Sequence, residues 1–392
     1  MFEMKWTGRH WITGDTVVIT CTEDGRIKRM ESSDQRSNVW IGPGLIDIQV
    51  NGAGGFNLND IAARPITALG VLNTLRTYGI TRFCPTVITG TKDRMLNSIH
   101  AITRACEIDG FMEYSTIGIH VEGPFISVDD GPRGAHNRDW VRDPNWDEFL
   151  EWKRVSNGRI KKVTLAPEKP GAIEFIKRLV DCGVIAAIGH SSATEEEIQR
   201  AIEAGATLST HLGNGAHPYI KRHPNYIWAQ LAADSMWAGL IPDGFHLPPS
   251  TLKVMVRTKG RKAILTSDAS QLCGMLPGRY KTYDNGEVVL EPSGLLHLAH
   301  THDILAGSAT PLYVGISNMV KFGISNLGEA INMASLHAAE LFDIAHQGVG
   351  TLCEGGPADV MIYNADEIES GGPIKILKTI CKGQIVYSDA DA

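Results

Sequence analysis

Several hallmarks of other protein classes are absent from this chain of 392 residues. Its seven cysteines are odd in number and form no CxxC pair, so neither a disulfide framework nor a zinc knuckle is expected. No apolar run approaches the roughly 20 residues that a membrane span requires. Residues 1–15 also lack the cationic and apolar stretches of a signal peptide. We therefore expect a cytoplasmic protein without a membrane partner.

Basic residues are in the minority as well. Lysine and arginine together number 37 against 44 acidic residues, which gives a formal net charge of −7. This balance argues against nucleic acid or an anionic membrane as a partner, but it leaves room for a local cationic pocket. A hydrophobic content of 43% and a charged content of 21% are typical of a globular protein. The length suffices for one large domain of about 250 residues and a smaller one.

What the chain does contain is a regular alternation of apolar runs and helical patterns. Helical spacing recurs at 66–78, 93–108, 172–181, 193–204 and 249–259. The candidate strands between these segments occupy residues 45–50, 81–88, 116–121, 162–166, 184–188, 206–210, 238–241 and 263–267. Eight parallel strands with crossover helices predict an α/β fold of the (β/α)8 TIM-barrel type. A doubly wound open sheet is the competing architecture.

The two ends of the chain carry short β patterns instead. Residues 16–20 and 26–30 flank a turn, and a similar pattern returns from about residue 348. We expect both termini to pair into one small accessory β-sandwich domain, built from residues 1–43 and 348–392. It would lie beside a barrel catalytic domain of residues 44–347.

Residues 184–217 hold the strongest chemical signal. Two apolar runs in this stretch each lead to a histidine, His190 in GHS and His211 in STHLGN. The strand predicted at 116–121 leads to Glu122, and in parallel α/β folds ligands bind at such carboxyl ends of strands. Two histidines and a carboxylate are a known ligand set for a catalytic divalent metal. We predict that these three residues hold a metal that acidifies a bound water and polarises a carbonyl.

Two further residues at strand ends suit catalysis. Asp268 follows the eighth strand, and an unliganded carboxylate there is placed to act as the general base towards that water. His246 in DGFH is placed to donate a hydrogen bond to the carbonyl oxygen as it gains negative charge. The alternatives are a pair of structural histidines at positions 190 and 211 and a helix N-cap at Asp268.

The chain as a whole resembles the N-acetylglucosamine-6-phosphate deacetylases of the amidohydrolase superfamily. The similar motifs occur in family order: PGLIDIQVNGAGG (43–55), HVEGPFIS (120–127), RGAHN (133–137), APE (166–168), GHSSAT (189–194), THLGN (210–214), DGFH (243–246), SDA (267–269) and LAGS (305–308). The resemblance implies a metal-dependent hydrolase of amino-sugar catabolism. Its reaction would convert N-acetylglucosamine 6-phosphate to glucosamine 6-phosphate and acetate.

The resemblance also implies a cofactor, a set of substrate contacts and an oligomeric state. One divalent metal per subunit is implied, with zinc as the expected ion and iron, manganese or cobalt as alternatives. Gln49 and Asn51 stand where many amidohydrolases have two histidines, and amides are poor ligands beside imidazole, so a second metal there should be weak or absent. Arg222 resembles an arginine that reaches the neighbouring active site, which implies a homodimer. The implied substrate contacts are Gln49, Gly123, His136, Asn214, Gly215, Arg222, His246, Leu305, Gly307 and Ser308.

One segment departs from the family pattern. The family usually reads HxxNAM, whereas this chain reads HLGNGAH at 211–217. Lys221, Arg222 and His223 keep a cationic cluster that favours an anionic substrate. Asn225, Tyr226 and Trp228 could equally line a pocket for a neutral sugar or a longer glycan. Two alternatives stay open. One is a deacetylase of an unphosphorylated or differently decorated N-acetyl amino sugar, and the other is a non-catalytic relative that uses the barrel for binding.

Three more histidines, His297, His300 and His302, lie close together in the sequence. By their number alone they resemble a metal cluster. Because they fall in a β-like segment after the barrel strands, we interpret them as solvated or structural side chains.

Overall fold

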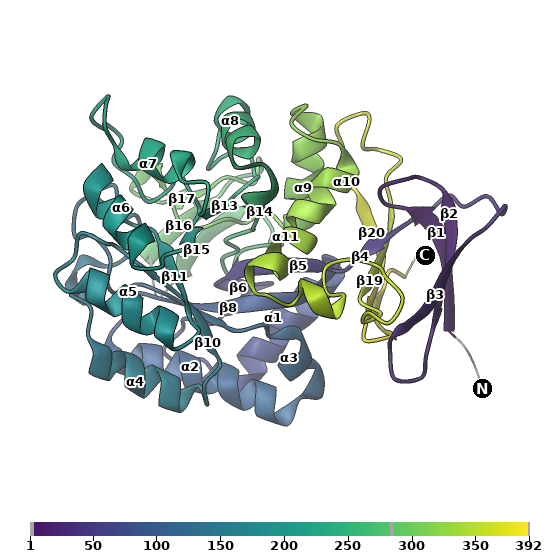
Figure 1. Cartoon of the computed structure of the whole chain (residues 1–392), viewed down its shortest axis with the longest axis horizontal. Coiled ribbons are helices and arrows are strands. Elements are labelled where there is room, and N and C mark those ends of the chain that lie inside the picture. The colour runs from purple at the N-terminus through teal and green to yellow at the C-terminus, as the bar shows by residue number, and fades with distance from the viewer. Residues whose placement is uncertain (1–3, 283–285, 391–392) are drawn as a thin grey trace.

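A large barrel and a smaller β region lie side by side in the computed structural model, which describes residues 4–282 and 286–390 (Figure 1). Within these residues, no helix combines the length and apolarity needed to cross a membrane. All seven cysteines lie in the described ranges, and each is a free thiol.

The barrel is an eight-stranded parallel sheet in which successive strands are neighbours. A parallel bridge between Val50 and Ala269 brings its two ends together. The predicted TIM barrel is therefore confirmed, and the open doubly wound sheet is excluded. The strands are β5 (Leu45–Val50), β8 (Ile80–Ile88), β9 (Ile119–Glu122), β10 (Ile160–Leu165), β11 (Ile185–Ile188), β12 (Leu208–Ser209), β13 (Trp237–Leu240) and β14 (Ala263–Leu265).

Helices cover the outside of the barrel (Figure 1). Helix α6 (Glu195–Glu203) begins with a capping box, because the Thr194 side chain accepts from the Glu197 N–H while the Glu197 side chain accepts from the Thr194 N–H. The predicted helices at 172–181 and 249–259 have the bounds observed for α5 and α8. Besides α6, the α-helices are α1 (Pro65–Thr77), α2 (Lys92–Ile108), α3 (Gly110–Ser115), α4 (Trp146–Val155), α5 (Ala172–Asp181), α7 (Tyr226–Ala232), α8 (Pro249–Lys259), α9 (Leu312–Lys321), α10 (Leu327–Met333) and α11 (Leu336–Leu341).

Both termini contribute to a seven-stranded sheet, at the right of Figure 1. Strands β4 and β19 pair antiparallel and thereby join the two ends of the chain, as predicted. The domain boundaries at 43 and 348 stay predictions, and residues 1–3 and 391–392 of that domain lie outside the described residues. The strands are β1 (Met4–His10), β2 (Thr16–Cys21), β3 (Ile27–Ser32), β4 (Trp40–Pro43), β19 (Val360–Asn364), β20 (Lys375–Cys381) and β21 (Gln384–Ser388).

A four-stranded antiparallel sheet is inserted between the last barrel strand and α9, where the sequence indicated only a β-like segment around His297, His300 and His302. Its strands are β15 (Gly278–Thr282), β16 (Gly286–Leu290), β17 (Leu296–Leu298) and β18 (Thr301–Leu305). A small apolar cluster of its own holds it, formed by Leu272, Val288, Leu290, Leu296, Leu298 and Ala306. Two short strands, β6 (Gly52–Ala53) and β7 (Phe56–Asn57), form a separate hairpin.

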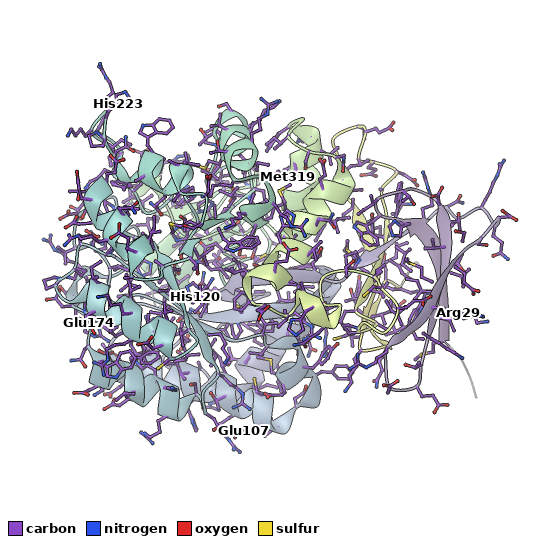
Figure 2. All side chains as sticks on the ribbon, viewed as in Figure 1. Arg29, Glu107, His120, Glu174, His223 and Met319 are labelled. Carbon is purple, nitrogen blue, oxygen red and sulfur yellow. The ribbon has the colours of Figure 1, made fainter. Side chains whose placement is uncertain are left out.

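Polar side chains inside the barrel have partners of their own. His120 lies within the barrel (Figure 2) and is fully buried. Its Nδ1 lies 3.2 Å from the Thr86 hydroxyl and its Nε2 lies 2.8 Å from the Thr164 hydroxyl. Lys162, also buried, donates to the Ile48 carbonyl at 2.7 Å. With both its nitrogens engaged by hydroxyl groups, His120 supports the interior of the barrel.

Candidate metal centre and catalytic site

Four chemically important side chains meet at the carboxyl ends of the barrel strands. Glu122 ends β9, and His190, His211 and Asp268 lie two or three residues beyond β11, β12 and β14. Each is less than a tenth exposed. The last three residues have left-handed backbones, with φ of 52°, 30° and 50° respectively. Residues other than glycine rarely adopt this conformation, and it often occurs at functional sites.

Three of these side chains place their donor atoms close together. The Nε2 atom of His211 lies 2.9 Å from the Glu122 Oε1 atom and 3.0 Å from the His190 Nε2 atom. The His190 Nε2 atom lies 3.3 Å from the same carboxylate oxygen. The structure thus brings together the three residues that the sequence singled out as metal ligands.

The nitrogen and oxygen atoms of these three side chains are arranged as ligands of a metal ion would be. The His190 Nδ1 atom lies 2.8 Å from the Pro132 carbonyl oxygen, which can only accept, so Nδ1 donates there and Nε2 is the nitrogen directed at the cluster. A carboxylate oxygen and two imidazole nitrogens then converge on one point. A hydrogen bond from the second ring nitrogen to a carbonyl is the usual support for a metal-binding histidine. These residues therefore fit a divalent metal ion.

The electrostatics of the cluster favour an ionised carboxylate. Burial alone would raise the pKa of Glu122, yet the hydrogen bonds and charges of His190 and His211 hold that pKa well below its usual range. Burial likewise opposes the charged form of His211, but its bond to Glu122 raises the pKa of the ring. The carboxylate is thus available as a negative ligand at neutral pH.

Asp268 lies beside the cluster and is held by two amide side chains. Its Oδ1 atom accepts from Gln49 Nε2 at 3.0 Å and from Asn51 Nδ2 at 2.8 Å, while Gln49 Nε2 also donates to Glu122 Oε1 at 2.8 Å. Burial and the charge of Glu122 raise the pKa of Asp268. Gln49 is 1% exposed and bridges two carboxylates, a placement that differs from the expected substrate contact.

His246 lines the cavity, and its ring contacts the Asp243 carboxylate. Its Nδ1 atom lies 2.6 Å from Asp243 Oδ2, and the Asp243 Oδ1 atom accepts from the His246 backbone N–H at 2.9 Å. Ser308 donates to Asp243 Oδ2 at 3.2 Å and is 2% exposed, so it supports the acid and does not line the cavity, in contrast to the expected substrate contact. Sequence reasoning missed the role of Asp243, although the DGFH motif contained it.

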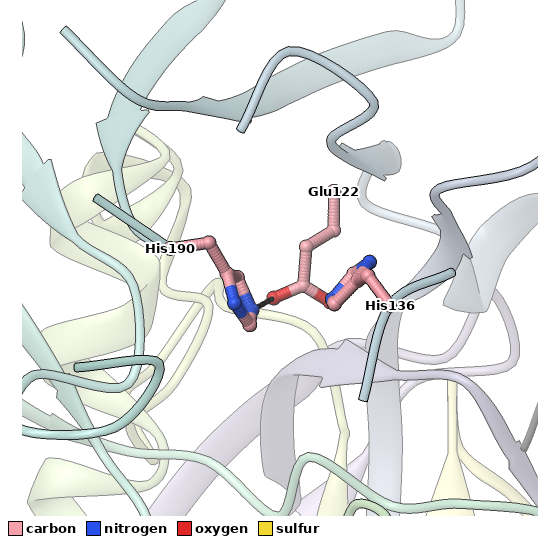
Figure 3. Close-up of side chains that lie close together, drawn as sticks. All are labelled: Glu122, His136 and His190. Carbon is pink, nitrogen blue, oxygen red and sulfur yellow. Dashed lines mark ion pairs between the residues drawn. The ribbon is translucent and has the colours of Figure 1, made fainter. Parts of the chain in front are cut away.

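His136 lies closer to the metal ligands than the sequence suggested. Figure 3 shows the Glu122 carboxylate between His190 and His136. The His136 and His190 rings make an edge contact at 4.3 Å, and a nitrogen of His136 lies within 4.8 Å of the donor atoms of the other two residues. Burial and the charge of His190 lower the pKa of His136 well below its usual value, so the ring is neutral. It can therefore accept a hydrogen bond from a sugar or assist the ligand set.

A cavity of about 1190 Å³ opens above the cluster. Asn214 lines it, and its Nδ2 atom is buried without a hydrogen-bond partner among the described residues. Gly215 lies against His190, where an added Cβ would come within 2.7 Å of the ring. Arg133, which the sequence reasoning did not single out, also lines the cavity. Of the other predicted contacts, those that line it are His136, His246, Leu305 and Gly307.

Besides Gln49 and Ser308, two more of the predicted contacts do not line the cavity. Gly123 joins Pro124 through a cis peptide and does not line the cavity. Arg222 is exposed on the loop after His217 and does not line it either. Its neighbour His223 lies at the outer edge of the molecule (Figure 2).

Comparisons with known proteins agree with the resemblance inferred from the sequence motifs. The model of the amidohydrolase family matches residues 40–386. N-acetylglucosamine-6-phosphate deacetylase of Bacillus subtilis (strain 168) is 30% identical over 89% of this chain and 85% of its own. N-acetylgalactosamine-6-phosphate deacetylase of Shewanella sp. (strain ANA-3) is 33% identical over 89% and 84%.

A solved structure matches over nearly the full length of both chains. It is an aspartate-to-alanine mutant of N-acetyl-D-glucosamine-6-phosphate deacetylase from Mycobacterium smegmatis, in complex with N-acetyl-D-glucosamine-6-phosphate. The TM-score is 0.86 at 25% identity, and the match covers 99% of this chain and 100% of the other. The chain therefore belongs to the amidohydrolase family, in the group that includes the N-acetylglucosamine-6-phosphate deacetylases.

Proposed function

We propose that this chain hydrolyses the acetamide of N-acetylglucosamine 6-phosphate to glucosamine 6-phosphate and acetate, as an enzyme of amino-sugar catabolism in the cytoplasm. The observation that carries the proposal is the convergence of Glu122, His190 and His211 beside the Asp268 carboxylate under one cavity. Structural residues alone would not require a buried carboxylate of raised pKa next to a metal-binding set. The family membership and the similar deacetylases support the same reaction.

Glu122, His190 and His211 would hold one divalent ion. Two imidazoles and a carboxylate are ligands that zinc commonly takes, and iron, manganese or cobalt also accept them. Such an ion, when bound, would polarise the acetamide carbonyl and make a water molecule at the site more acidic. Gln49 and Asn51 donate hydrogen bonds from their amide nitrogens to carboxylates, and amide oxygens are poor ligands beside imidazole, so a second metal there would be weak or absent.

Asp268 would move the proton in both halves of the reaction. Because the amides of Gln49 and Asn51 occupy Oδ1, the Oδ2 atom is the one left to accept the proton of the attacking water. The water oxygen bonds to the acetyl carbon, and the carbon–nitrogen bond then breaks. Asp268 returns the proton to the departing amine, so the carboxylate is regenerated.

His246 would stabilise the oxygen that gains negative charge. Its Nδ1 atom faces the Asp243 carboxylate at 2.6 Å, so Nδ1 carries a proton. Donation from Nε2 to the substrate then requires a proton on that nitrogen as well, with the Asp243 carboxylate 2.6 Å away as the counter-charge. A preorganised donor of this kind stabilises the transition state more than the ground state.

The phosphate would bind between two subunits of a homodimer. Asn214 offers a buried N–H donor from one subunit, and Arg222 of the other would supply a guanidinium, which suits a phosphate. The exposed position of Arg222 on its loop supports this arrangement. Leu305 and Gly307 would contact the sugar from the far wall of the cavity.

A galactosamine substrate is a second candidate, because the Shewanella relative at 33% identity acts on N-acetylgalactosamine 6-phosphate according to its name. The deciding experiment measures acetate release from N-acetylglucosamine, N-acetylgalactosamine and their 6-phosphates after metal reconstitution. We expect the largest kcat/KM with N-acetylglucosamine 6-phosphate. A larger value with the galactose epimer would reassign the sugar, and equal values with and without phosphate would refute the phosphate site.

The variant Arg222→Ala tests the phosphate contact directly. We expect it to lower kcat/KM for the phosphorylated sugar by at least about tenfold, since a charge-assisted hydrogen bond is worth roughly 1.5–3 kcal/mol. It should leave the value for the unphosphorylated sugar unchanged. The matched control is Arg257→Ala, which removes an exposed arginine of α8, and it should change neither value.

A further inference from the structure

A second group of possible metal ligands lies on the inserted sheet. Glu291 directly follows β16, His297 lies in β17 and His302 lies in β18. The three side chains meet on one side of this small sheet, and their donor atoms all lie within 4.8 Å of one another. None of them belongs to the Glu122 cluster, and the proposed deacetylation does not use them.

One carboxylate oxygen is shared between the two rings. The Glu291 Oε1 atom lies 3.0 Å from His302 Nε2 and 3.4 Å from His297 Nε2. The other oxygen, Oε2, accepts from the Ser293 hydroxyl at 3.3 Å, so the carboxylate is oriented with Oε1 towards the histidines. The two rings are tilted by 39° with their centroids 4.4 Å apart.

The orientation of His297 directs one ring nitrogen at the carboxylate. Its Nδ1 atom lies 2.9 Å from the Leu298 carbonyl oxygen, which can only accept, so Nδ1 donates there and Nε2 is the nitrogen directed at Glu291 Oε1. The His297 side chain is 10% exposed, so the ring is held in this orientation with little access for water.

The distances between the donor atoms also suit a metal ion. With ligand bonds of about 2.0–2.1 Å, two ligands of a tetrahedral ion lie about 3.3–3.4 Å apart. The measured separations of 3.0 and 3.4 Å are close to this value without any movement of the backbone. The bond from His297 Nδ1 to a carbonyl is the support that metal-binding histidines usually have.

We propose that Glu291, His297 and His302 bind a second divalent transition-metal ion, such as zinc, that ties β16, β17 and β18 together. His302 and the next two residues line the catalytic cavity, so the ion would stiffen one wall of it. This proposal does not depend on the proposed reaction. The competing occupant is a proton, which would turn the group into an imidazolium–carboxylate pair.

The test counts bound metal in the whole chain. Protein stripped with a chelator is loaded with excess Zn²⁺, dialysed against metal-free buffer and analysed by inductively coupled plasma mass spectrometry. We expect two equivalents in the wild type and one in His302→Ala, whose side chain is 64% exposed and not needed for folding. His300→Ala removes an exposed histidine two residues away, outside the group, and should keep both equivalents.

A variant of the first site separates the two ions. His190→Asn should bind one equivalent, and adding His302→Ala should abolish binding. Retention of both equivalents in His302→Ala would overturn the second site. So would a single equivalent in the wild type that disappears in His190→Asn. Because the readout is metal content, failure of the deacetylation itself would leave this result unaffected.

Discussion

Replacement of Asp268 by asparagine tests the proposed proton transfer with the least disturbance of the fold. The asparagine carbonyl oxygen can take the place of Oδ1 and keep the hydrogen bonds from Gln49 and Asn51. The amide NH2 group then replaces Oδ2, the atom that would accept the proton. The variant therefore changes the basicity of the site while preserving its shape.

The expected loss is large because a positioned general base contributes roughly 10²- to 10⁴-fold to a rate. At about 1.36 kcal/mol for each factor of ten, this corresponds to about 2.7–5.4 kcal/mol in the activation barrier. We expect kcat to fall by that factor while the Kd for the substrate stays within a few fold. The melting temperature should not fall, because a buried carboxylate of raised pKa beside Glu122 becomes neutral.

The assay measures acetate release for kcat and calorimetric titration for the Kd, with bound metal counted in each sample. Asp303→Asn is the matched control, since Asp303 is exposed, lines the same cavity and has no part in the proposed reaction. A kcat for Asp268→Asn within tenfold of the wild type, with metal still bound, would refute its role as the base.

Three other substitutions probe the support of the site and the barrel. Gly215→Ala places a Cβ within 2.7 Å of His190 at a φ of +57°, so we expect lower metal content and roughly a 10²-fold loss of activity; unchanged metal content would count against it. Asp243→Asn should lower kcat more than it raises KM, because it removes the charge behind His246; a change in KM alone would contradict that role. Burial lowers the pKa of Lys259 to about 8 from an unfolded value of 10.5, so the unfolded state binds the extra proton between these values. The unfolding free energy should therefore rise with pH across that window relative to Lys259→Met, as urea titrations at pH 8 and 10 would measure, and parallel curves would contradict it.

The barrel was predictable because its signals are local. Residues 45–50, 172–181 and 249–259 have the observed bounds, since apolar periodicity and glycine or proline punctuation act within a few residues. The metal ligands were predictable for a related reason: in a parallel barrel, the ends of all strands face the same side. A polar residue at a strand end can therefore be placed on that face of the barrel from the sequence, before the side chains that it contacts are known.

The partners of each side chain were harder to predict. Gln49 points inward like its neighbours on alternate positions, but only the folded barrel shows that it meets Glu122 and Asp268 across the first, third and eighth strands. The inserted sheet was recognised only as a β-like segment, because its strands are short and amphipathic and follow a complete barrel. The contact between Glu291 and His302 depends on the hairpin register of that sheet, which the local sequence does not determine.

The backbone at the strand ends connects the fold to the proposed chemistry. A left-handed residue other than glycine costs of order 1–3 kcal/mol, so His190, His211 and Asp268 persist in this conformation only because neighbouring segments hold them. Their carbonyls accept hydrogen bonds from the backbone N–H groups of Ser127, Asn214 and Ser308 respectively, at 2.9–3.0 Å. Each of these donors lies in or next to a loop around the site. The loops that shape the cavity thus also hold the strained turns, so the same segments define the cavity and fix the backbone that carries His190, His211 and Asp268.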